Sequence, residues 1–329
     1  MKVNTKLQAR QDAYVFEYPI FAELADQQLD VFWPWSEISV GKDKQVLLTE
    51  MTESEKHGVI TALKLFTKYE LCVGNEYWLG KVMRNFRRPE IQRMASAFGH
   101  VELNSHAPFY NEINKELGLD TEDFYNSYLE DETLTSRMEF IDEMVSSKDL
   151  SLSLAAFSMV EGAVLYSSFA FLKHFQSNGK NKLVNICRGI NMSVTDENLH
   201  SIGGAALCNQ LVKEQELTTK ELESFHKKVY DVAEKIKEHE FRIVEMFFEK
   251  GTMDGISSTQ MKHFVESRIN TCLQQLNMKK LYDVKYNPVA DWFYKGINNY
   301  QFNDFFSGVG REYQRDWDAD GFSWVKGVV

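Results

Sequence analysis

The sequence is poor in residues that interrupt helices and in residues that form covalent cross-links. Its 329 residues include only 5 prolines and 18 glycines, which favours long uninterrupted helices. The four cysteines form no C-x-x-C pair and are scattered along the chain: Cys72, Cys187, Cys208 and Cys272. This spacing argues against a disulfide framework and against a thiolate metal site. It fits a reducing cytosol, so we expect a cytoplasmic location.

Basic residues are outnumbered by acidic ones. The chain has 37 Lys and Arg against 48 Asp and Glu, which gives a formal net charge of -11 at pH 7. Because surplus negative charge opposes non-specific binding to nucleic acid, we expect no nucleic-acid partner. Residues 1–11 are polar and mixed in charge, and they contain no apolar stretch of the signal-peptide type.

One apolar run, residues 151–175, is long enough to raise the question of a membrane span. It contains Glu161 near its middle and several serines. A carboxylate in the middle of a membrane is costly. A helix buried in the core of a large soluble protein is the better interpretation, so we expect no membrane association.

Helical periodicity dominates the sequence from Thr52 onward. Apolar residues recur at helical steps, and Thr218 and Glu221 have the spacing of a capping box. No strand-type alternation extends beyond a few residues. We predict an all-α fold with an irregular N-terminal arm (1–50), a helical domain (51–285) and a C-terminal segment with a tail (286–329). The pattern predicts helices over about residues 52–83, 89–117, 121–145 (as two helices), 150–175, 182–212, 218–250 and 258–276.

Four glutamates and two histidines lie inside apolar helical stretches. A charged side chain is costly to bury there unless it has a specific partner. Two are single glutamates, and the other four form two Glu/His pairs, one with a four-residue step and one with a three-residue step. Along the chain they follow the order E, E-x-x-x-H, E, E-x-x-H: Glu70, Glu102 and His106, Glu161, Glu197 and His200.

This order is typical of a dinuclear metal site in a four-helix bundle. One Glu comes from each of two helices, and a Glu/His pair comes from each of the other two. Carboxylate oxygens with imidazole suit iron or manganese, and two cations cancel the repulsion between buried carboxylates. A buried Glu taken alone is more often a hydrogen-bonded core residue, but the full set in this order favours two metal ions. Iron is the expected metal, and manganese or a mixed pair are the alternatives.

Tyr110 extends the first Glu/His pair by one more helical step. Residues four apart lie on nearly the same helix face, so Glu102, His106 and Tyr110 should form one ladder. Pro108 lies within this ladder and predicts a bend or a bulge in the helix. A core tyrosine with a satisfied hydroxyl is the simpler interpretation of Tyr110.

Five segments together carry a resemblance to a known family: Leu65-Phe66-Thr67-x-x-Glu70, Pro89-Glu90-Ile91, Glu102…His106-x-x-x-Tyr110, Val160-Glu161…Tyr166-x-x-Phe169 and Asp196-Glu197-x-x-His200. Over about residues 30–300 the chain resembles the small (β, radical-generating) subunit of class I ribonucleotide reductase. The resemblance implies a ferritin-like helical bundle with flanking helices. It implies one metal ion held by Glu70, Glu102 and His106 and a second held by Glu161, Glu197 and His200.

The resemblance also implies which residues make and conduct a radical. The oxygen-activated metal pair would oxidise Tyr110 to a stable radical, in an apolar pocket to which Leu165 and Phe169 contribute. Trp33 and Asp196 would join His106 in a hydrogen-bonded path by which the radical leaves. Trp35 competes with Trp33 for this role, and Trp33 is preferred because it follows Phe32 as in the family pattern.

The sequence departs from the family pattern at two places. The family has E-x-x-H at the first pair, whereas here His106 follows Glu102 by four residues and Ser105 occupies the usual histidine place. Both spacings share a helix face, and a one-residue bulge would accommodate the difference. The second departure concerns the relay tyrosine of the C-terminal tail. Tyr313 is our preferred residue, and Trp324 is the alternative.

The resemblance implies a homodimer that pairs with a large (α) subunit. Ribonucleotides would be reduced to deoxyribonucleotides on that subunit, so the chain would be the β subunit of a ribonucleoside-diphosphate reductase, active only in the complex. Two rival classes are a ferritin-like di-metal oxidase or monooxygenase and an iron-storage protein. The oxidase would have the same metal ligands, and an oxidised state of Tyr110 would separate it from the reductase. Iron-storage chains of the ferritin type are typically much shorter, and that role needs neither Trp33 nor an acidic C-terminal tail.

Overall fold

The structure is a computed structural model that describes residues 5–66, 69–284 and 286–295. Every regular element in this part of the chain is a helix, apart from one isolated bridge between Met253 and Ile256, so the predicted all-α fold is confirmed. The longer helices are α1 (Pro19–Asp30), α2 (Gly41–Thr49), α3 (Glu53–Leu65), α6 (Pro89–Val101), α7 (Ala107–Leu117), α8 (Glu122–Glu130), α9 (Glu132–Ser146), α10 (Leu150–Met159), α11 (Tyr166–Lys173), α12 (Val184–Gln215), α13 (Thr219–Phe247) and α14 (Ser258–Gln275).

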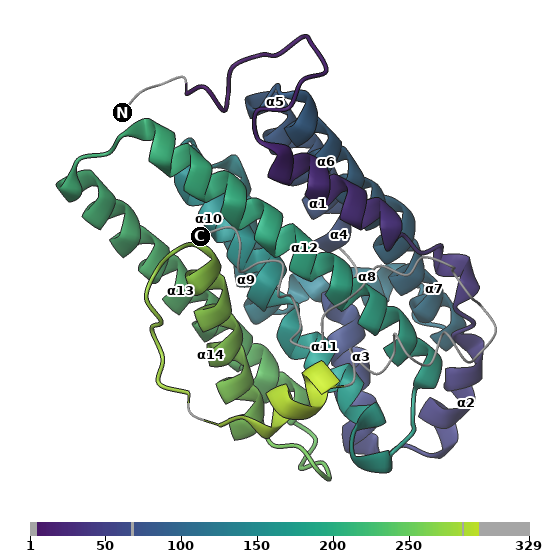
Figure 1. Cartoon of the computed structure of the whole chain (residues 1–329). Helices are drawn as coiled ribbons and strands as arrows, with labels where there is room; N and C mark the ends of the chain where they lie inside the picture. Colours follow the sequence, from purple (N-terminus) through teal and green to yellow (C-terminus); the bar gives the residue numbers. More distant parts are fainter. Residues whose placement is uncertain (1–4, 67–68, 285, 296–329) are drawn as a thin grey trace.

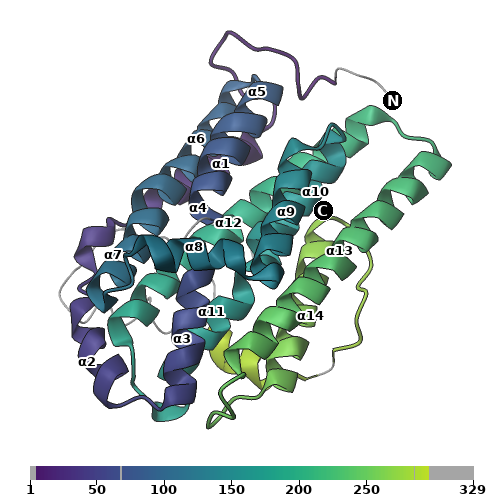
Figure 2. The same cartoon turned by 180° about the vertical axis from the view of Figure 1, so that it is seen from behind.

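The helices pack around a central pair. α12 runs through the middle of the molecule and packs along α10 (Figure 1). α13 and α14 lie side by side on one flank, and α1 and α6 lie together on the other, as both views show (Figures 1 and 2). The candidate metal site lies between these flanks, where side chains of α12 and of three short segments come together: α4 (Tyr69–Leu71), η3 (Glu102–His106) and η4 (Val160–Val164). η4 packs on α12, and α4 packs on η3.

The long apolar run is a core element. The segment Leu150–Gly179 is long and apolar enough to cross a membrane, with a mean hydropathy of 1.4, but its most apolar window is entirely buried inside the protein. Neighbouring helices α9, α12, α13 and α14 cover it. This burial agrees with the predicted core helix. The run is not one continuous α-helix, because η4 interrupts it with a π-helical turn.

The N-terminal region was predicted to be irregular. Residues 5–18 lie outside the helices, as expected, but for residues 19–30 and 41–49 the prediction is wrong. α1 and α2 are regular helices, and Phe21 and Leu24 of α1 are buried. α1 packs along α6. The signal was missed because Tyr18, at the start of α1, makes no side-chain cap, and only Pro19 in the first turn marks the beginning.

The prediction of one continuous helix over about residues 52–83 is also wrong. α3 ends at Leu65, and α4 begins at Tyr69 and continues as the π-helical segment η2 (Cys72–Val82). Gly74 of η2 approaches the next helix closely, since a Cβ there would lie 3.1 Å from Cβ of Glu102 and 3.0 Å from Cγ of Leu103. The close approach brings the segment that carries Glu70 against η3.

Three helix ends have well-defined caps. The capping box predicted from the sequence is present, since Thr218 pairs with Glu221 at the start of α13, and Thr52 forms a second one with Glu55 at the start of α3. Gly118 ends α7 in the left-handed conformation, at φ 71°. Each satisfies backbone groups that a helix end leaves unpaired.

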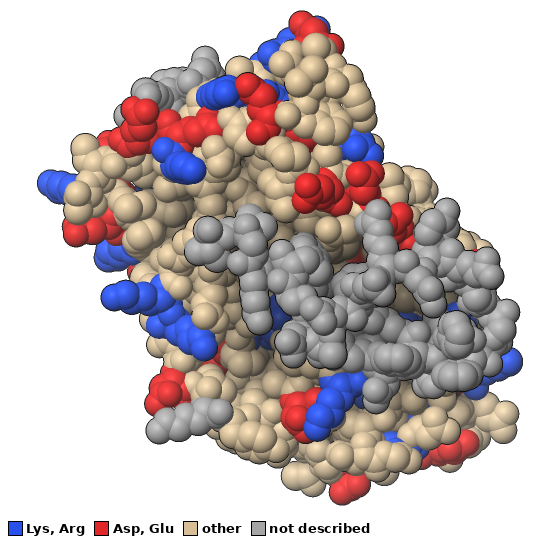
Figure 3. Space-filling model, viewed as in Figure 1, with Lys and Arg blue, Asp and Glu red and all other residues tan. Residues whose placement is uncertain are grey.

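The C-terminal tail lies outside the described residues, so the structure says nothing of Tyr313, of Trp324 or of the acidic stretch from Asp316. The proposed boundaries at residues 50 and 285 stay predictions. On the described part of the face in Figure 3, acidic and basic side chains are interspersed.

Candidate metal centre

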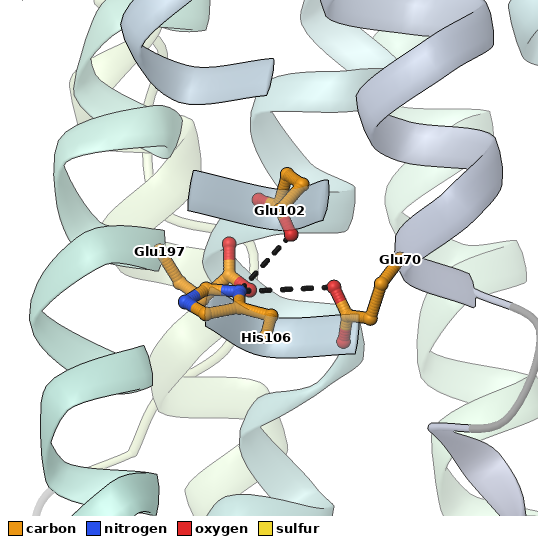
Figure 4. A group of neighbouring side chains, drawn as sticks. All are labelled: Glu70, Glu102, His106 and Glu197. Carbon is orange, nitrogen blue, oxygen red and sulfur yellow. Dashed lines mark hydrogen bonds and ion pairs between the residues drawn. The ribbon is translucent and has the colours of Figure 1, made fainter. Parts of the chain in front are cut away.

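The structure brings the six predicted ligands together from four helical segments. Their donor atoms form two overlapping groups, in each of which all atoms lie within 4.8 Å of one another. Figure 4 shows four of the side chains pointing toward one another between the helices. All six are buried, and they make up the groups Glu70, Glu102, His106, Glu197 and Glu102, Glu161, Glu197, His200.

Two carboxylates belong to both groups. Oε2 of Glu102 lies 3.0 Å from Nδ1 of His106, and its Oε1 lies 2.8 Å from Nδ1 of His200. Glu197 likewise spans the histidines, with Oε1 3.4 Å from Nδ1 of His106 and Oε2 3.2 Å from Nδ1 of His200. If each group held an ion, these two carboxylates would contribute to both sites.

The two remaining glutamates lie one at each end of the cluster. Glu70 reaches Nδ1 of His106 at 3.8 Å, and Glu161 reaches Nδ1 of His200 at 3.8 Å. Among the described residues, both oxygens of Glu70 and Oε2 of Glu161 are buried without a hydrogen-bond partner. Buried polar atoms left unpaired cost free energy, so their presence needs a compensating interaction. Two cations in these groups would supply it, and the donor set therefore fits a dinuclear metal site.

The close packing of four glutamates shifts the pKa values of the residues in the cluster. Burial and the charge of Glu102 hold the pKa of Glu70 well above its ordinary value, and burial and Glu197 do the same to the pKa of Glu161. Burial opposes protonation of His200, but its hydrogen bonds to the shared glutamates outweigh this and raise its pKa to about 9. Bound metal cations would offset this crowding of negative charge.

A π-helical turn explains the unusual spacing of the first Glu/His pair. In η3 the backbone N–H of Ala107 donates to the carbonyl of Glu102, five residues back, so the turn holds one residue more than an α-helical turn. Ser105, at the place expected for histidine, is buried and donates to the carbonyl of Trp33 at 2.6 Å. Pro108 falls in the first turn of α7 and does not break the helix. The bulge predicted from the sequence is therefore present.

The π-helical turn that carries Glu161 is held by two buried arginines. Nε of Arg268 donates to the carbonyl of Gly162 at 2.9 Å, and a guanidinium nitrogen of Arg137 donates to the carbonyl of Val164 at 2.7 Å. A π-helical turn leaves carbonyls without their usual α-helical partners, and buried donors satisfy these groups. The arginines fix the backbone beside Glu161.

A hydrogen-bonded path leads from the cluster toward the N-terminal region. Nε2 of His106 lies 2.9 Å from Oδ2 of Asp196, which also accepts from the indole N–H of Trp33 at 2.7 Å. The other oxygen of Asp196 accepts from Gln28 at 2.7 Å. Trp33 is 2% exposed, whereas Trp35 is only partly buried in the short helix η1 (Trp35–Glu37). The structure thus places Trp33 at Asp196.

Tyr110 lies beside the cluster in an aromatic pocket. Its ring stacks on Phe66, with centroids 4.3 Å apart and planes 9° apart, and Phe66 in turn stacks on Phe169. The ring centroid of His106 lies 6.3 Å away. Leu165 is also buried in the core cluster. Burial and the charge of Glu70 hold the pKa of the Tyr110 hydroxyl well above its ordinary value.

Comparison with known families shows which family the chain belongs to. A family model described as "Ribonucleotide reductase, small chain" matches residues 10–288. The chain belongs to the ribonucleotide reductase small-chain family. The resemblance seen in the sequence is confirmed.

Curated members of this family are distant in sequence. The chain is 24% identical to the probable ribonucleoside-diphosphate reductase small subunit 048L of Invertebrate iridescent virus 3, covering 92% of this chain and 85% of the relative. It is 22% identical to the β subunit of ribonucleoside-diphosphate reductase 1 of Salmonella typhimurium, covering 83% of this chain and 80% of the relative.

Solved structures share the fold. A putative class I ribonucleotide reductase from Bacillus halodurans superposes with a TM-score of 0.75 at 22% identity, covering 84% of this chain and 99% of that one. The dimanganese(II)-NrdF of Streptococcus sanguinis gives a TM-score of 0.76 at 19% identity, covering 88% and 99% of the two chains.

Three residues at the site of this family member were missed in the sequence. Trp78 donates its indole N–H to Glu161 at 2.8 Å, and Ser193 accepts from the hydroxyl of Tyr110 at 3.0 Å. Gln28 is the third. Ser193 could have been found, because it lies four residues before Glu197 on the same helix face. Gln28 could not, because its helix was not predicted.

Replacing Trp78 with phenylalanine tests the hydrogen bond to Glu161. Phenylalanine keeps an aromatic ring against Tyr77 and Phe98 but removes the N–H. Partners that orient a metal ligand typically contribute about 10- to 100-fold in metal affinity, so we expect Trp78→Phe to weaken one metal site by that order. Metal titration of the purified protein measures it, with Trp292→Phe as a control. Unchanged affinity would show that the indole does not orient Glu161.

Proposed function

We propose that this chain is the radical-generating small subunit of a class I ribonucleotide reductase. The observation that carries the proposal is the pair of buried Glu/His groups that share two carboxylates, with a buried tyrosine beside them. Membership of the small-chain family supports the same function.

Each group of donors would hold one ion. Glu70 and His106 would hold the first, Glu161 and His200 would hold the second, and Glu102 and Glu197 would complete both shells. Iron is the proposed metal, and manganese or a mixed pair are the alternatives, since the Streptococcus sanguinis relative carries the description dimanganese(II). When bound and exposed to oxygen, the metal pair would supply the oxidising equivalent for Tyr110.

The protein's own residues would protect and conduct the radical. The stacked rings of Phe66 and Phe169 exclude water from Tyr110, which is 2% exposed. Asp196 accepts from Trp33 and faces Nε2 of His106, so a continuous hydrogen-bonded route leads away from the cluster. An imidazole oriented by a carboxylate keeps its tautomer and its basicity, which suits both metal binding and this route.

The partner would be a large subunit that carries the reductive chemistry. The relatives from Invertebrate iridescent virus 3 and Salmonella typhimurium are named as subunits of ribonucleoside-diphosphate reductase. The cysteines of this chain are free, and Cys187, Cys208 and Cys272 are buried, so they are not placed to reduce a nucleotide. We propose a homodimer in the cytoplasm that docks the large subunit through residues 286–329, with Tyr313 as the relay residue.

Electron paramagnetic resonance after anaerobic loading with ferrous iron and exposure to oxygen tests the proposal. The wild-type protein should give a tyrosyl radical signal. Tyr110→Phe, which removes the oxidisable hydroxyl and keeps the ring, should bind the same amount of iron and lose the signal completely. If the iron sample shows no radical, manganese and mixed loading are tried next. Metal oxidation without a radical under every loading would favour a di-metal oxidase or an iron-storage protein.

A further inference from the structure

A serine hydroxyl lies against the proposed radical residue. Ser193 precedes Glu197 by four residues and His200 by seven, so it projects from the same face of α12. The hydroxyl of Tyr110 donates to Oγ of Ser193 at 3.0 Å. Within residues 5–66, 69–284 and 286–295, this is the one hydrogen bond that the Tyr110 hydroxyl makes. Ser193 is therefore the polar contact of a tyrosine that is otherwise surrounded by rings.

Because Ser193 and Tyr110 are buried among apolar rings, their hydrogen bond has a large influence on the energy of Tyr110. Ser193 is 0% exposed and Tyr110 is 2% exposed, so bulk water does not compete for either hydroxyl. Phe66 stacks on the Tyr110 ring at 4.3 Å, and Phe109 lies at 5.3 Å from it. In such a low-dielectric environment a single hydrogen bond changes the energy of its partner more than it does in water.

A serine hydroxyl can hydrogen-bond Tyr110 both when the phenol donates and when the radical accepts. A hydroxyl is one donor and also an acceptor, and its proton rotates to suit the partner. The resting phenol is a donor, because a phenol with a pKa of about 10 keeps its proton at neutral pH and this one donates to Ser193. The neutral phenoxyl radical has lost that proton and can only accept. Ser193 can accept in the first state and donate in the second while keeping its own proton.

We propose that Ser193 is a positioning residue that hydrogen-bonds Tyr110 in both the phenol and the radical state and thereby sets how readily the radical forms and how long it lasts. The proposal rests on the proposed function, since it takes Tyr110 to be the radical residue. It assigns no metal contact to Ser193, whose hydroxyl is occupied by Tyr110.

Electron paramagnetic resonance at high field tests the radical state. A hydrogen bond to the phenoxyl oxygen lowers the largest g value of a tyrosyl radical and introduces a proton coupling that exchanges in D2O. Wild type and Ser193→Thr should show both features. Ser193→Val, which has nearly the shape of threonine without its hydroxyl, and Ser193→Ala should raise the g value and lose the exchangeable coupling. An unchanged g value and coupling in Ser193→Val would overturn the proposal.

Infrared spectroscopy of the resting protein tests the phenol state without any radical. Isotope-labelled tyrosine marks the ring C–O vibration, and Tyr110→Phe identifies the band that belongs to this residue. The band should shift in Ser193→Ala and stay unchanged in Ser151→Ala, which removes another buried serine that binds Gln215. If the protein forms no radical, the proposed function fails, but the shifted band still establishes the Ser193 contact. A band that does not shift overturns it.

Discussion

Replacement of Glu102 by alanine is expected to empty both metal sites. Its two oxygens face two different histidines, at 3.0 Å from His106 and 2.8 Å from His200, so one side chain serves both donor groups. Glu161 belongs to one group only. Glu161→Ala should therefore lose one ion of the pair and largely keep the other. Both variants should keep the fold, because removing one carboxylate also removes repulsion from a buried acidic cluster.

Metal analysis of the purified variants, beside circular dichroism, measures this difference. The two substitutions remove the same atoms, so any difference in metal content reflects the position of the glutamate in the cluster and not the cavity that is left. A Glu102→Ala protein that still binds two ions would refute the bridging role. Equal metal content in Glu161→Ala and wild type would remove Glu161 from the site.

Trp33→Phe is expected to separate radical formation from turnover. The tyrosyl radical should form at the wild-type level, because the indole N–H of Trp33 donates to Asp196 and not to Tyr110 or to any of the six predicted metal ligands. Ribonucleotide reduction with the large subunit should fall to background. Phenylalanine cannot donate to Asp196, as the indole does at 2.7 Å, and a benzene ring is far harder to oxidise than an indole.

Paired assays of the same samples decide the outcome: radical yield by electron paramagnetic resonance, and nucleotide reduction in the presence of the large subunit. Trp35→Phe is the matched control, since this neighbouring tryptophan lies in η1 and is only partly buried. It should retain both properties. Full turnover by Trp33→Phe would contradict the route through Asp196, and loss of the radical would place Trp33 in metal-centre assembly.

Much of the site could be predicted from the sequence, because its ligands are charged residues at positions where the helical pattern predicts buried apolar ones. A charge inside an apolar helical stretch stands out, and Glu70 and Glu161 are visible for that reason alone. Helical spacing then assigns the two Glu/His pairs to common faces. The structure brings all six side chains together, and Glu102 and Glu197 proved to be shared between the groups, which spacing cannot reveal.

The residues that support the ligands were harder to predict. Trp78 lies in an apolar run, where a tryptophan looks like any core residue until its N–H is seen to reach Glu161. Arg137 and Arg268 are far along the chain from the turn they hold, and only the packing of helices brings them there. α1 has no side-chain cap at its start, so local signals were too weak to reveal it.

The five-residue turn of η3 also has a consequence for how the chain tolerates a change of length. Each residue of an α-helix advances the helix by about 100°, so one extra residue in a regular helix would swing everything after it to another face. The π-helical turn absorbs that residue locally, and Phe109 and Tyr110 keep their phase toward the core. Shortening the turn by one residue, at Ser105, would restore the common Glu-x-x-His spacing without rotating α7. The deletion would also remove the hydrogen bond from Ser105 to the carbonyl of Trp33. The additional residue therefore links the η3 turn directly to the segment that carries Trp33.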